Sequence, residues 1–596
     1  MCTKIKGLLL TIFLLHFCAL FAQNKSLAQE LYLNNNYQEA VVIYEELLEK
    51  KPKSSNYITI IADCYRNLEA FDKAHKVLDK ALLQNPNQYI YLLEKGQTYN
   101  LEKKTTQAQK TFQKLLSTLE KNPKRLAFYA QQFKKYLLLE EAVFCYELLQ
   151  KNKYNANYDY ELARLYGSLS QKEKMFEAYL NYTQDNPSRL AIVKRRLQEF
   201  TSVDANSESN LLLKKILFKR IQNTPITTYN ELLSWLFIQE KDYTKAFLQE
   251  RALYKRTHQS PMGLLGLARI ALEDKEIESS KNTLKYLIQN SSLTSYVLEA
   301  HQMLLKIESE QALNDLNKQV VVRETYERLI KEYKSHPKSI ELTLDYAYFL
   351  AFKQNERKEA INILKELRKK PHINDLKKAK AEILLADVLL LNNQFNEALI
   401  NYARATEHAK NHPVAQEANF KVAKASYYTG DFKWALTQLN VLKASTTQLI
   451  ANDAMKLALL IEDYMDKEYT NEALARFAKA DLLNFQEKPD KALEVYETLI
   501  DAQDAKTLQD AILYHKAQLL YEQKKYSQSL ESTQKLIKNH SNSLYFDDIL
   551  YLQAKLHETL ENIEAAKQSY KQLVFNHQDS IYYTDARKAY RRLTGE

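Results

Sequence analysis

Small residues recur along this chain at a fixed interval of 34 positions, and this interval constrains the fold more than any other feature. One series consists of Ala28, Ala62, Gly96 and Ala130. A second series begins twelve residues later and consists of Ala40, Ala74, Ala108 and Ala142. Large apolar residues keep the same interval at Tyr44, Leu78, Phe112 and Tyr146. A period of this length is typical of a solenoid of stacked helix pairs, in which each unit buries its apolar face against its neighbours.

These positions resemble the tetratricopeptide repeat (TPR), in which two antiparallel helices cross at a small residue in each. Pro52 and Pro86 follow the second helix of the first two units, where a proline biases the preceding residue out of the helical region and ends the helix. The resemblance implies an all-α fold, namely a TPR-type α-solenoid in which antiparallel helix pairs wind into a right-handed superhelix.

Glycine is scarce, with only 7 among 596 residues, against a typical usage of roughly 7%. We therefore expect few turns with positive φ, because glycine adopts them at the least steric cost. Folds that depend on such turns, such as sheets and nucleotide-binding folds, are disfavoured. The 41 tyrosines are expected to fill the grooves between helices rather than to form a platform for a cofactor or sugar.

The repeat spacing changes along the chain and predicts six segments. They are a signal peptide at 1–22, an N-terminal TPR array with a 34-residue period at 23–188, an irregular helical segment or hinge at 189–230, divergent TPR-like helices at 231–345, TPR repeats at 346–445, and a C-terminal TPR array with a 37-residue period and a capping helix at 446–596. The polar stretch 201–210 is expected to be an exposed boundary loop and an early protease site.

The first 22 residues resemble a secretory signal peptide, since Lys4 and Lys6 precede an apolar run that ends at Ala22. An uncleaved anchor is the alternative. Cleavage would leave Cys64 and Cys145 as the two cysteines of the mature chain. We expect both to be buried, in different repeats, and too far apart for a disulfide, which needs Cα atoms within about 7 Å.

Two resemblances concern the last third of the chain. The stretch 542–548 (NSLYFDD) and its echo at 579–586 (DSIYYTDA) are similar to the repeat junction of envelope TPR proteins, including the TPR proteins of the outer-membrane β-barrel assembly machine and of the Tol-Pal system. Residues 422–461 and 586–593 are similar to a family of exported Bacteroidota TPR proteins of unknown mechanism. These resemblances imply an exported protein that is periplasmic or associated with the outer membrane, and they imply no activity.

The sequence contains no Gly-rich phosphate loop, HExxH, CxxC or GxSxG motif. His408 and His412 have the i, i+4 spacing of a metal-binding pair, but zinc sites usually need three or four protein ligands. His540 and His577 share one repeat position, where imidazole can bond the last carbonyls of a helix. We therefore predict no catalytic residue, no metal site, no cofactor and no small-molecule substrate.

Loss of Lys4 and Lys6 would lower the formal net charge from +10 to +8, which is modest for this length. Basic residues concentrate between 189 and 220. They could attract an acidic partner or an anionic membrane surface, so peripheral membrane association stays open, although a solvated helix face is favoured. No aromatic-basic signature accompanies them, and we expect no nucleic-acid partner.

The first helices of a TPR array line its concave face, where positions just after each small residue are expected to meet a partner. These candidate partner-binding residues are Gln29, Tyr32, Asp63, Arg66, Gln97, Asn100, Gln131 and Lys134. The carboxylate clamp of chaperone-binding TPRs is not expected, because Lys25 matches one of its positions while Gln29 and Ile60 replace its asparagines. A merely solvated concave surface is the alternative.

These observations favour an exported, non-enzymatic TPR scaffold or adaptor that mediates protein-protein interactions at the cell envelope. Its partners would be proteins or peptides of unknown identity. Two other hypotheses stay open. One is an enzyme acting on peptidoglycan or another envelope glycan, with a site on the irregular stretches 189–230 or 444–480. The other is a structural spacer between the outer membrane and the wall.

Overall fold

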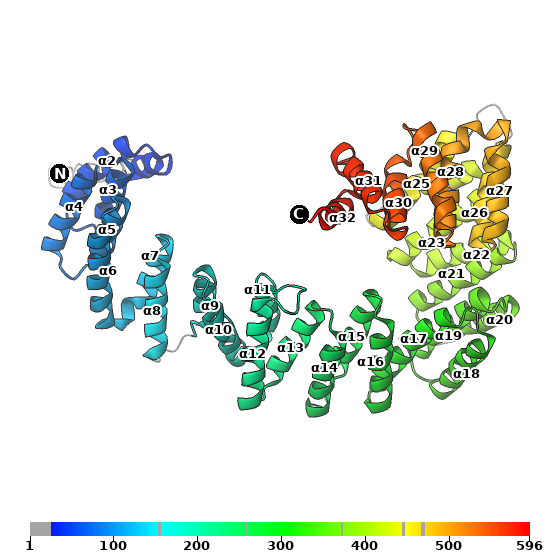
Figure 1. Ribbon diagram of the computed structural model, residues 1–596, viewed down its shortest axis with the longest axis horizontal. Coiled ribbons are helices and arrows are strands. Elements are labelled where there is room, and N and C mark those ends of the chain that lie inside the picture. Colours follow the sequence, from blue (N-terminus) through cyan, green and yellow to red (C-terminus); the bar gives the residue numbers. More distant parts are fainter. Residues whose placement is uncertain are drawn as a thin grey trace, which may run out of the picture. The chain divides into compact units, whose positions relative to one another are not determined.

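The computed structural model describes residues 25–152, 157–257, 260–370, 373–443, 448–465 and 471–595. Within these ranges the chain is helical and contains no strand, which confirms the predicted all-α fold. It divides into two compact units, Met1–Leu267 and Ala268–Glu596. Figure 1 shows antiparallel helix pairs stacked in sequence order within each unit. The predicted signal peptide at 1–22 lies outside the described residues.

Unit 1 opens with helical residues 25–33. Its further α-helices are α2 (Tyr37–Lys50), α3 (Ser55–Asn67), α4 (Phe71–Gln84), α5 (Ile90–Leu101), α6 (Thr105–Glu120), α7 (Leu126–Lys135), α8 (Leu139–Lys151), α9 (Asp159–Ser168), α10 (Lys172–Asp185), α11 (Leu190–Leu197), α12 (Glu208–Asn223), α13 (Thr227–Gln239) and α14 (Tyr243–Thr257). Short 3₁₀ turns, η1 (Pro123–Arg125) and η2 (Pro187–Arg189), precede α7 and α11. Helix α15 (Met262–Glu273) contains the boundary between the units.

Unit 2 continues with longer helices. They are α16 (Ile277–Asn290), α17 (Thr294–Gln311), α18 (Leu316–Glu332), α19 (Ser339–Tyr348), α20 (Arg357–Leu367), α21 (Asp375–Leu391), α22 (Phe395–His408), α23 (Pro413–Tyr428), α24 (Phe432–Lys443), α25 (Gln448–Tyr464), α26 (Glu472–Phe485), α27 (Pro489–Ile500), α28 (Gln509–Glu522), α29 (Tyr526–Asn539), α30 (Phe546–Thr559), α31 (Ile563–Asn576) and α32 (Tyr583–Thr594). A π-helical turn, η3 (Phe349–Lys353), extends α19, and a 3₁₀ turn, η4 (Gln503–Leu508), precedes α28.

The helix crossings lie at the small residues that the period identifies. Ala40, Ala62, Ala74 and Ala130 are completely buried. At Gly96 in α5, a Cβ atom would collide with the ring of Phe112 in α6. Each pair therefore depends on a residue small enough to let the two backbones approach, which confirms the predicted solenoid of helix pairs.

The turn inside most pairs contains a residue with positive φ, and it is rarely glycine. In the first four pairs this residue is Asn35, Glu69, Lys103 or Leu137, with φ between 54° and 64°. The residue after it donates its backbone N–H to a carbonyl five positions earlier, as in Ala70 to Tyr65 (2.8 Å). This bond satisfies a carbonyl at the end of the first helix. The expectation of few positive-φ turns was therefore wrong, because repeated hydrogen bonds hold non-glycine residues in that conformation.

The polar loop was predicted at 201–210, but helix α12 already begins at Glu208, so the last three of these residues are helical. Asn210 is completely buried, and its side-chain amide donates to the carbonyl of Ser202 (2.8 Å) and to Glu240 (2.9 Å). The loop is thus tied to the next helix pair. Its role as a segment boundary, like the other predicted boundaries, stays a prediction.

Cys64 and Cys145 are both free and buried, as predicted. Burial raises the pKa of each thiol to about 12, so both stay protonated at neutral pH and behave as small apolar residues.

The junction sequences in the last third connect successive repeats. Ser543 donates to Asp510 (2.7 Å), and 37 residues later Ser580 donates to Asp547 (2.6 Å). Two residues after each serine, a tyrosine stacks on a tyrosine of the first helix of the preceding repeat. The ring centroids of Tyr545 and Tyr514 are 4.5 Å apart. The next repeat would need an aspartate at position 584, which is Thr584. The aspartate is therefore not repeated in α32, and the predicted capping role of this helix stays a prediction.

Candidate functional site

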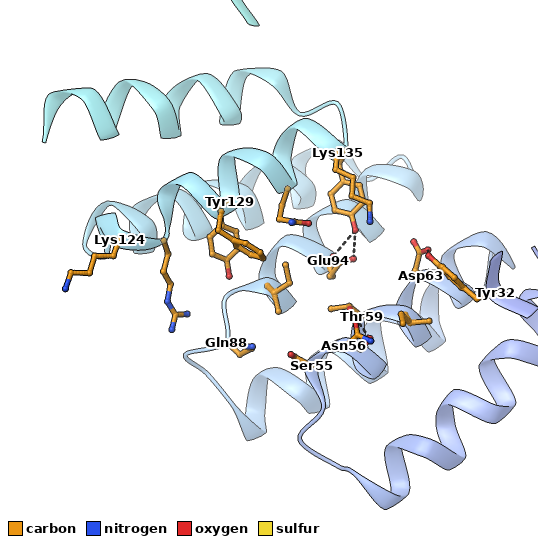
Figure 2. Close-up of a pocket in the computed structure, with 16 residues that line it drawn as sticks. Tyr32, Ser55, Asn56, Thr59, Asp63, Gln88, Glu94, Lys124, Tyr129 and Lys135 are labelled. Atoms are coloured by element: carbon orange, nitrogen blue, oxygen red, sulfur yellow. Dashed lines mark hydrogen bonds between the residues drawn. The ribbon is translucent and has the colours of Figure 1, made fainter. Parts of the chain in front are cut away.

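A groove of about 680 Å³ runs along the first helices of successive pairs in unit 1 (Figure 2). Its lining side chains come from α3, α5 and α7, with Tyr32 at one end and the η1 turn at the other. Because these helices are the first members of adjacent pairs, the groove crosses three consecutive repeats.

Equivalent residues of the three repeats line this groove at the 34-residue interval. One set comprises Asn56, Ile90 and Lys124, and a second comprises Ile60, Glu94 and Phe128. Members of the two sets are four residues apart and so share one helix face. Neither set belongs to the predicted partner-facing row, which was drawn from positions just after each small residue, and Ile60 was considered only as a position of the carboxylate clamp. Their common 34-residue spacing was the signal that could have identified them.

Of the eight residues predicted to face a partner, Tyr32 and Asp63 line the groove. The Tyr32 hydroxyl donates to Asp63 Oδ2 at 2.5 Å. Gln29 and Asn100 are exposed outside the groove lining, whereas Gln97 is buried. Gln131 donates to the hydroxyl of Tyr146 on α8, the second helix of its own pair (2.6 Å), and Lys134 pairs with Glu161 on α9 of the next repeat (2.5 Å). A partner-binding role for these residues stays a prediction.

Arg66 is buried and does not belong to the groove lining. It is only 4% exposed, and its guanidinium contacts Glu94 Oε2 and Asp63 Oδ1, each at 2.7 Å. Charge reversal of Arg66 would thus break a buried ion pair, so a loss of partner binding in that variant would not identify a contact residue.

Glu94 is the centre of a buried polar network that joins four helices. It is 3% exposed, and the hydroxyl of Tyr136, the residue after α7, donates to its Oε1 at 2.8 Å, as the dashed lines in Figure 2 mark. Together with Tyr32 and Arg66, this gives every carboxylate oxygen of Asp63 and Glu94 a donor. Buried ionic groups are tolerated when their hydrogen-bonding capacity is satisfied in this way.

The network keeps its protonation states at neutral pH. Burial and the nearby Glu94 raise the pKa of Tyr136, and burial together with Asp63 raises that of Tyr32. Burial opposes the charge of Arg66, but Glu94 and the other anionic neighbours raise its pKa above the usual range. Both phenols therefore remain donors and the guanidinium remains charged.

The rest of the groove combines apolar and basic side chains. Ile60 and Ile90 are half-buried, and Phe128 is 54% exposed. Lys124 and Arg125 lie where η1 meets α7, and Lys135 lies at the other end of α7. None of these three basic residues forms an ion pair with a residue that the structure describes.

Some of the other basic residues form ion pairs of their own. Between 189 and 220, Arg196 pairs with Glu199 (2.9 Å), Lys214 with Glu240 (2.9 Å), and Arg220 with Glu177. In unit 2, a pocket of about 360 Å³ beside the π-helical turn contains Lys306 and Lys353, which pair with Asp345 (3.3 Å) and Glu310 (3.1 Å).

The histidines take structural positions. His412 is the N-cap of α23, where its Nδ1 accepts from the backbone N–H of Val414 (3.2 Å). His540 and His577 are C-caps of α29 and α31, and their backbone N–H groups, rather than the imidazoles, donate to the last turn. Among the described residues no group of three or more His, Cys, Asp or Glu side chains is placed to hold a metal ion. No helix in those ranges is both long and apolar enough to cross a membrane.

Two family models match separate parts of the chain. The model for subunit 3 of the anaphase-promoting complex, or cyclosome, matches residues 33–115, and a tetratricopeptide repeat model matches residues 477–543. The first match covers α2 to α5 and most of α6, and the second lies between α26 and the residues after α29. No curated protein matches the chain.

Two solved structures are similar to this chain at low identity. The structure of Naa15/Naa10 bound to HypK-THB is 12% identical, with 97% of this chain and 96% of that chain covered and a TM-score of 0.27. A tetratricopeptide repeat protein from Parabacteroides merdae ATCC 43184 is 14% identical, with 50% of this chain and 99% of that chain covered and a TM-score of 0.21.

Proposed function

We propose that this tetratricopeptide repeat protein is a scaffold that binds an extended segment of a partner protein in the groove of α3, α5 and α7. The observation that carries the proposal is the continuity of the groove, to which three consecutive repeats contribute equivalent side chains. Packed helices lie about 8–10 Å apart, and an extended chain advances about 3.3 Å per residue. Three neighbouring helices together therefore span about the length of six extended residues, so one segment of that length can contact side chains of all three.

The chemistry of the lining suits such a segment. Asn56, Gln88 and Gln132 supply amide donors and acceptors for a peptide backbone. Ile60, Ile90 and Phe128 supply apolar surface for its side chains. Because the Arg66–Glu94 network fixes the wall before a partner arrives, little conformational entropy would be lost in the protein on binding.

The proposed scaffold is non-catalytic and acts at the cell envelope. TPR repeats typically bind proteins without catalysis. The envelope location rests on the signal-like run that ends at Ala22 and on the resemblances in the last third of the chain. Cell fractionation with mass spectrometry of the N-terminus is the test, and a mature chain that begins at Gln23 in the envelope fraction is expected. A full-length chain in the cytoplasm would contradict the proposed location.

Site-specific photocrosslinking in cells tests the binding function. A photoreactive residue at Phe128, in the groove, is expected to crosslink to a defined partner. The matched control is Leu83, which is 84% exposed and lies on α4, a second helix outside the groove lining. Equal crosslinking from both positions, or none from Phe128, would refute a groove-binding scaffold.

A further inference from the structure

We infer that the segment bound by this groove is acidic, with carboxylate side chains on either side of an apolar residue. This inference rests on the proposed binding function of the same groove and specifies its partner. It concerns acidic side chains within a segment, not the carboxylate at the end of a chain.

The acidic residues of the groove are unavailable to a basic partner. Asp63 and Glu94 both contact Arg66, and their remaining oxygens accept from the hydroxyls of Tyr32 and Tyr136. Glu94 is also only 3% exposed, so it is not accessible to the side chain of a partner. Asp63 is more exposed, but its charge is already paired with Arg66, so it attracts a second cation less than an unpaired carboxylate would.

The basic residues that line the groove, unlike the acidic ones, are not engaged in ion pairs within the described residues. Lys124, Arg125 and Lys135 have no acidic partner among the described residues, although Arg125 is held over the ring of Tyr89 (5.3 Å). With Arg66 included, four basic side chains stand against two acidic ones, so the net formal charge around the groove is +2. The pocket of unit 2 differs, because Lys306 and Lys353 each pair with a local carboxylate. Unpaired charges of one sign attract and select a partner of the other sign.

The positions of the basic residues in the groove determine how far apart the acidic residues of the partner segment should be. Lys124 lies in η1, just before α7, and Lys135 is the last residue of α7, so the two lysines are eleven residues apart at opposite ends of this segment (Figure 2). At about 1.5 Å per residue their separation along α7 is about 16 Å, which an extended segment covers in about five residues. Carboxylates about five residues apart could therefore meet both lysines, while an apolar side chain between them contacts Phe128.

The shape of the site favours a peptide over an anionic membrane. Ile60 and Ile90 line the groove and are half-buried, whereas Lys124 and Lys135 are exposed. A flat bilayer surface could reach the exposed lysines but not these two side chains. A single extended chain could reach both, and it would gain apolar burial in addition to charge pairing.

Peptide display on the full mature chain tests the inference. A phage-displayed library of random nine-residue peptides is selected in parallel on the natural chain and on the double variant Lys124→Glu/Lys135→Glu. Both lysines are exposed or at the groove rim, so the double variant is expected to keep the natural thermal transition in circular dichroism. Selection on the natural chain is expected to enrich Asp and Glu on both sides of an apolar residue, and this enrichment is expected to disappear on the double variant.

An enriched peptide, synthesised with both ends capped and labelled with fluorescein, then gives affinities by fluorescence anisotropy. Each single variant, Lys124→Glu or Lys135→Glu, is expected to weaken binding about fivefold, as for the loss of one exposed charge pair worth about 1 kcal/mol. The matched control Lys80→Glu changes an exposed lysine of α4 outside the groove and should leave the affinity unchanged. The affinity should fall as salt rises.

Other outcomes separate this inference from the scaffold function itself. Enrichment of neutral or basic peptides that crosslink to Phe128 would overturn the acidic segment and leave the scaffold standing. No enrichment over a blank support, together with no crosslinking from Phe128, would overturn both. Binding of phosphatidylglycerol vesicles or single-stranded RNA through Lys124 and Lys135, without acidic peptides, would overturn the inference by assigning the groove to another class of partner.

Discussion

Replacement of Arg66 by methionine tests the physical account of the groove most directly. The substitution keeps a long, flexible side chain but removes the charge that faces Glu94 and Asp63. Glu94 is 3% exposed, so its carboxylate would remain buried with the Tyr136 hydroxyl as its main donor. Leaving one member of a buried ion pair uncompensated costs about 3–5 kcal/mol. We expect a loss of that size in the local stability of α3 and α5.

The double variant Arg66→Met/Glu94→Met supplies the decisive comparison. It removes both charges and replaces them with apolar groups of similar length, a change that is often nearly neutral for a buried pair. It should therefore recover most of the lost stability and give a coupling free energy of about 2 kcal/mol or more. A third variant, Asp63→Asn, should cost less than Arg66→Met because Asp63 is only half-buried.

Amide hydrogen exchange with mass spectrometry suits this test, since it reports local opening of α3 and α5 in the full chain without assuming two-state unfolding. Protection in α28 and α30 of unit 2 serves as the internal control and should not change. If Arg66→Met altered the protection of α3 and α5 by less than about 1 kcal/mol, a costly buried charge could not be the reason for this network. A double variant no more stable than the single one would refute the same reasoning.

Three further predictions concern the repeats themselves. Leu137→Gly should stabilise α7 and α8 by about 1 kcal/mol in hydrogen exchange, because Leu137 has a φ of 58°, which is strained for a residue with a Cβ atom, and its side chain is 80% exposed. Glu140→Gly, inside α8, should destabilise the same helices. Ala74→Glu should abolish the folded N-terminal pairs by forcing a carboxylate into a completely buried crossing, while Lys76→Glu on the exposed face should not, as circular dichroism on heating will show. Burial lowers the pKa of His301 to about 4, below its unfolded value of about 6.5. The unfolded chain therefore binds the proton more readily, and the stability of α17 should fall as pH decreases from about 6.5 to about 4. A His301→Gln variant should lack this dependence in hydrogen exchange measured at several pH values.

The sequence was most informative where one repeat contacts the next in a fixed register. The small residues at the crossings could be predicted because each crossing leaves room for hardly more than a methyl group, as Ala62 and Ala74 show, or for no side chain beyond hydrogen, as Gly96 shows. The same requirement recurs in every pair and so appears as a period. The positive-φ turns recur equally regularly, but they were not predicted. Their conformation is set by hydrogen bonds after the helix end, and residues as different as Glu69 and Leu137 adopt it.

The groove lining overlaps the predicted partner-facing row at Tyr32 and Asp63, and it also includes Glu94 and Phe128, which lie outside that row. The partner-binding role of the predicted row stays a prediction. Which turn of a helix faces a concave surface depends on the tilt between successive pairs. A single repeat does not encode that tilt, because it arises only when several repeats pack together.

Arg66 and Lys134 illustrate the division between sequence and tertiary structure. They occupy equivalent repeat positions two periods apart, and the sequence alone determined that both lie on a first helix beside a buried small residue. Only the tertiary structure decided that Arg66 is buried against Glu94, 28 residues away, while Lys134 pairs with Glu161 at a partly exposed site. The physical reason is that packing at a helix crossing depends on side-chain size at a fixed spacing, whereas the burial and pairing of a charge depend on which residues of other repeats surround it.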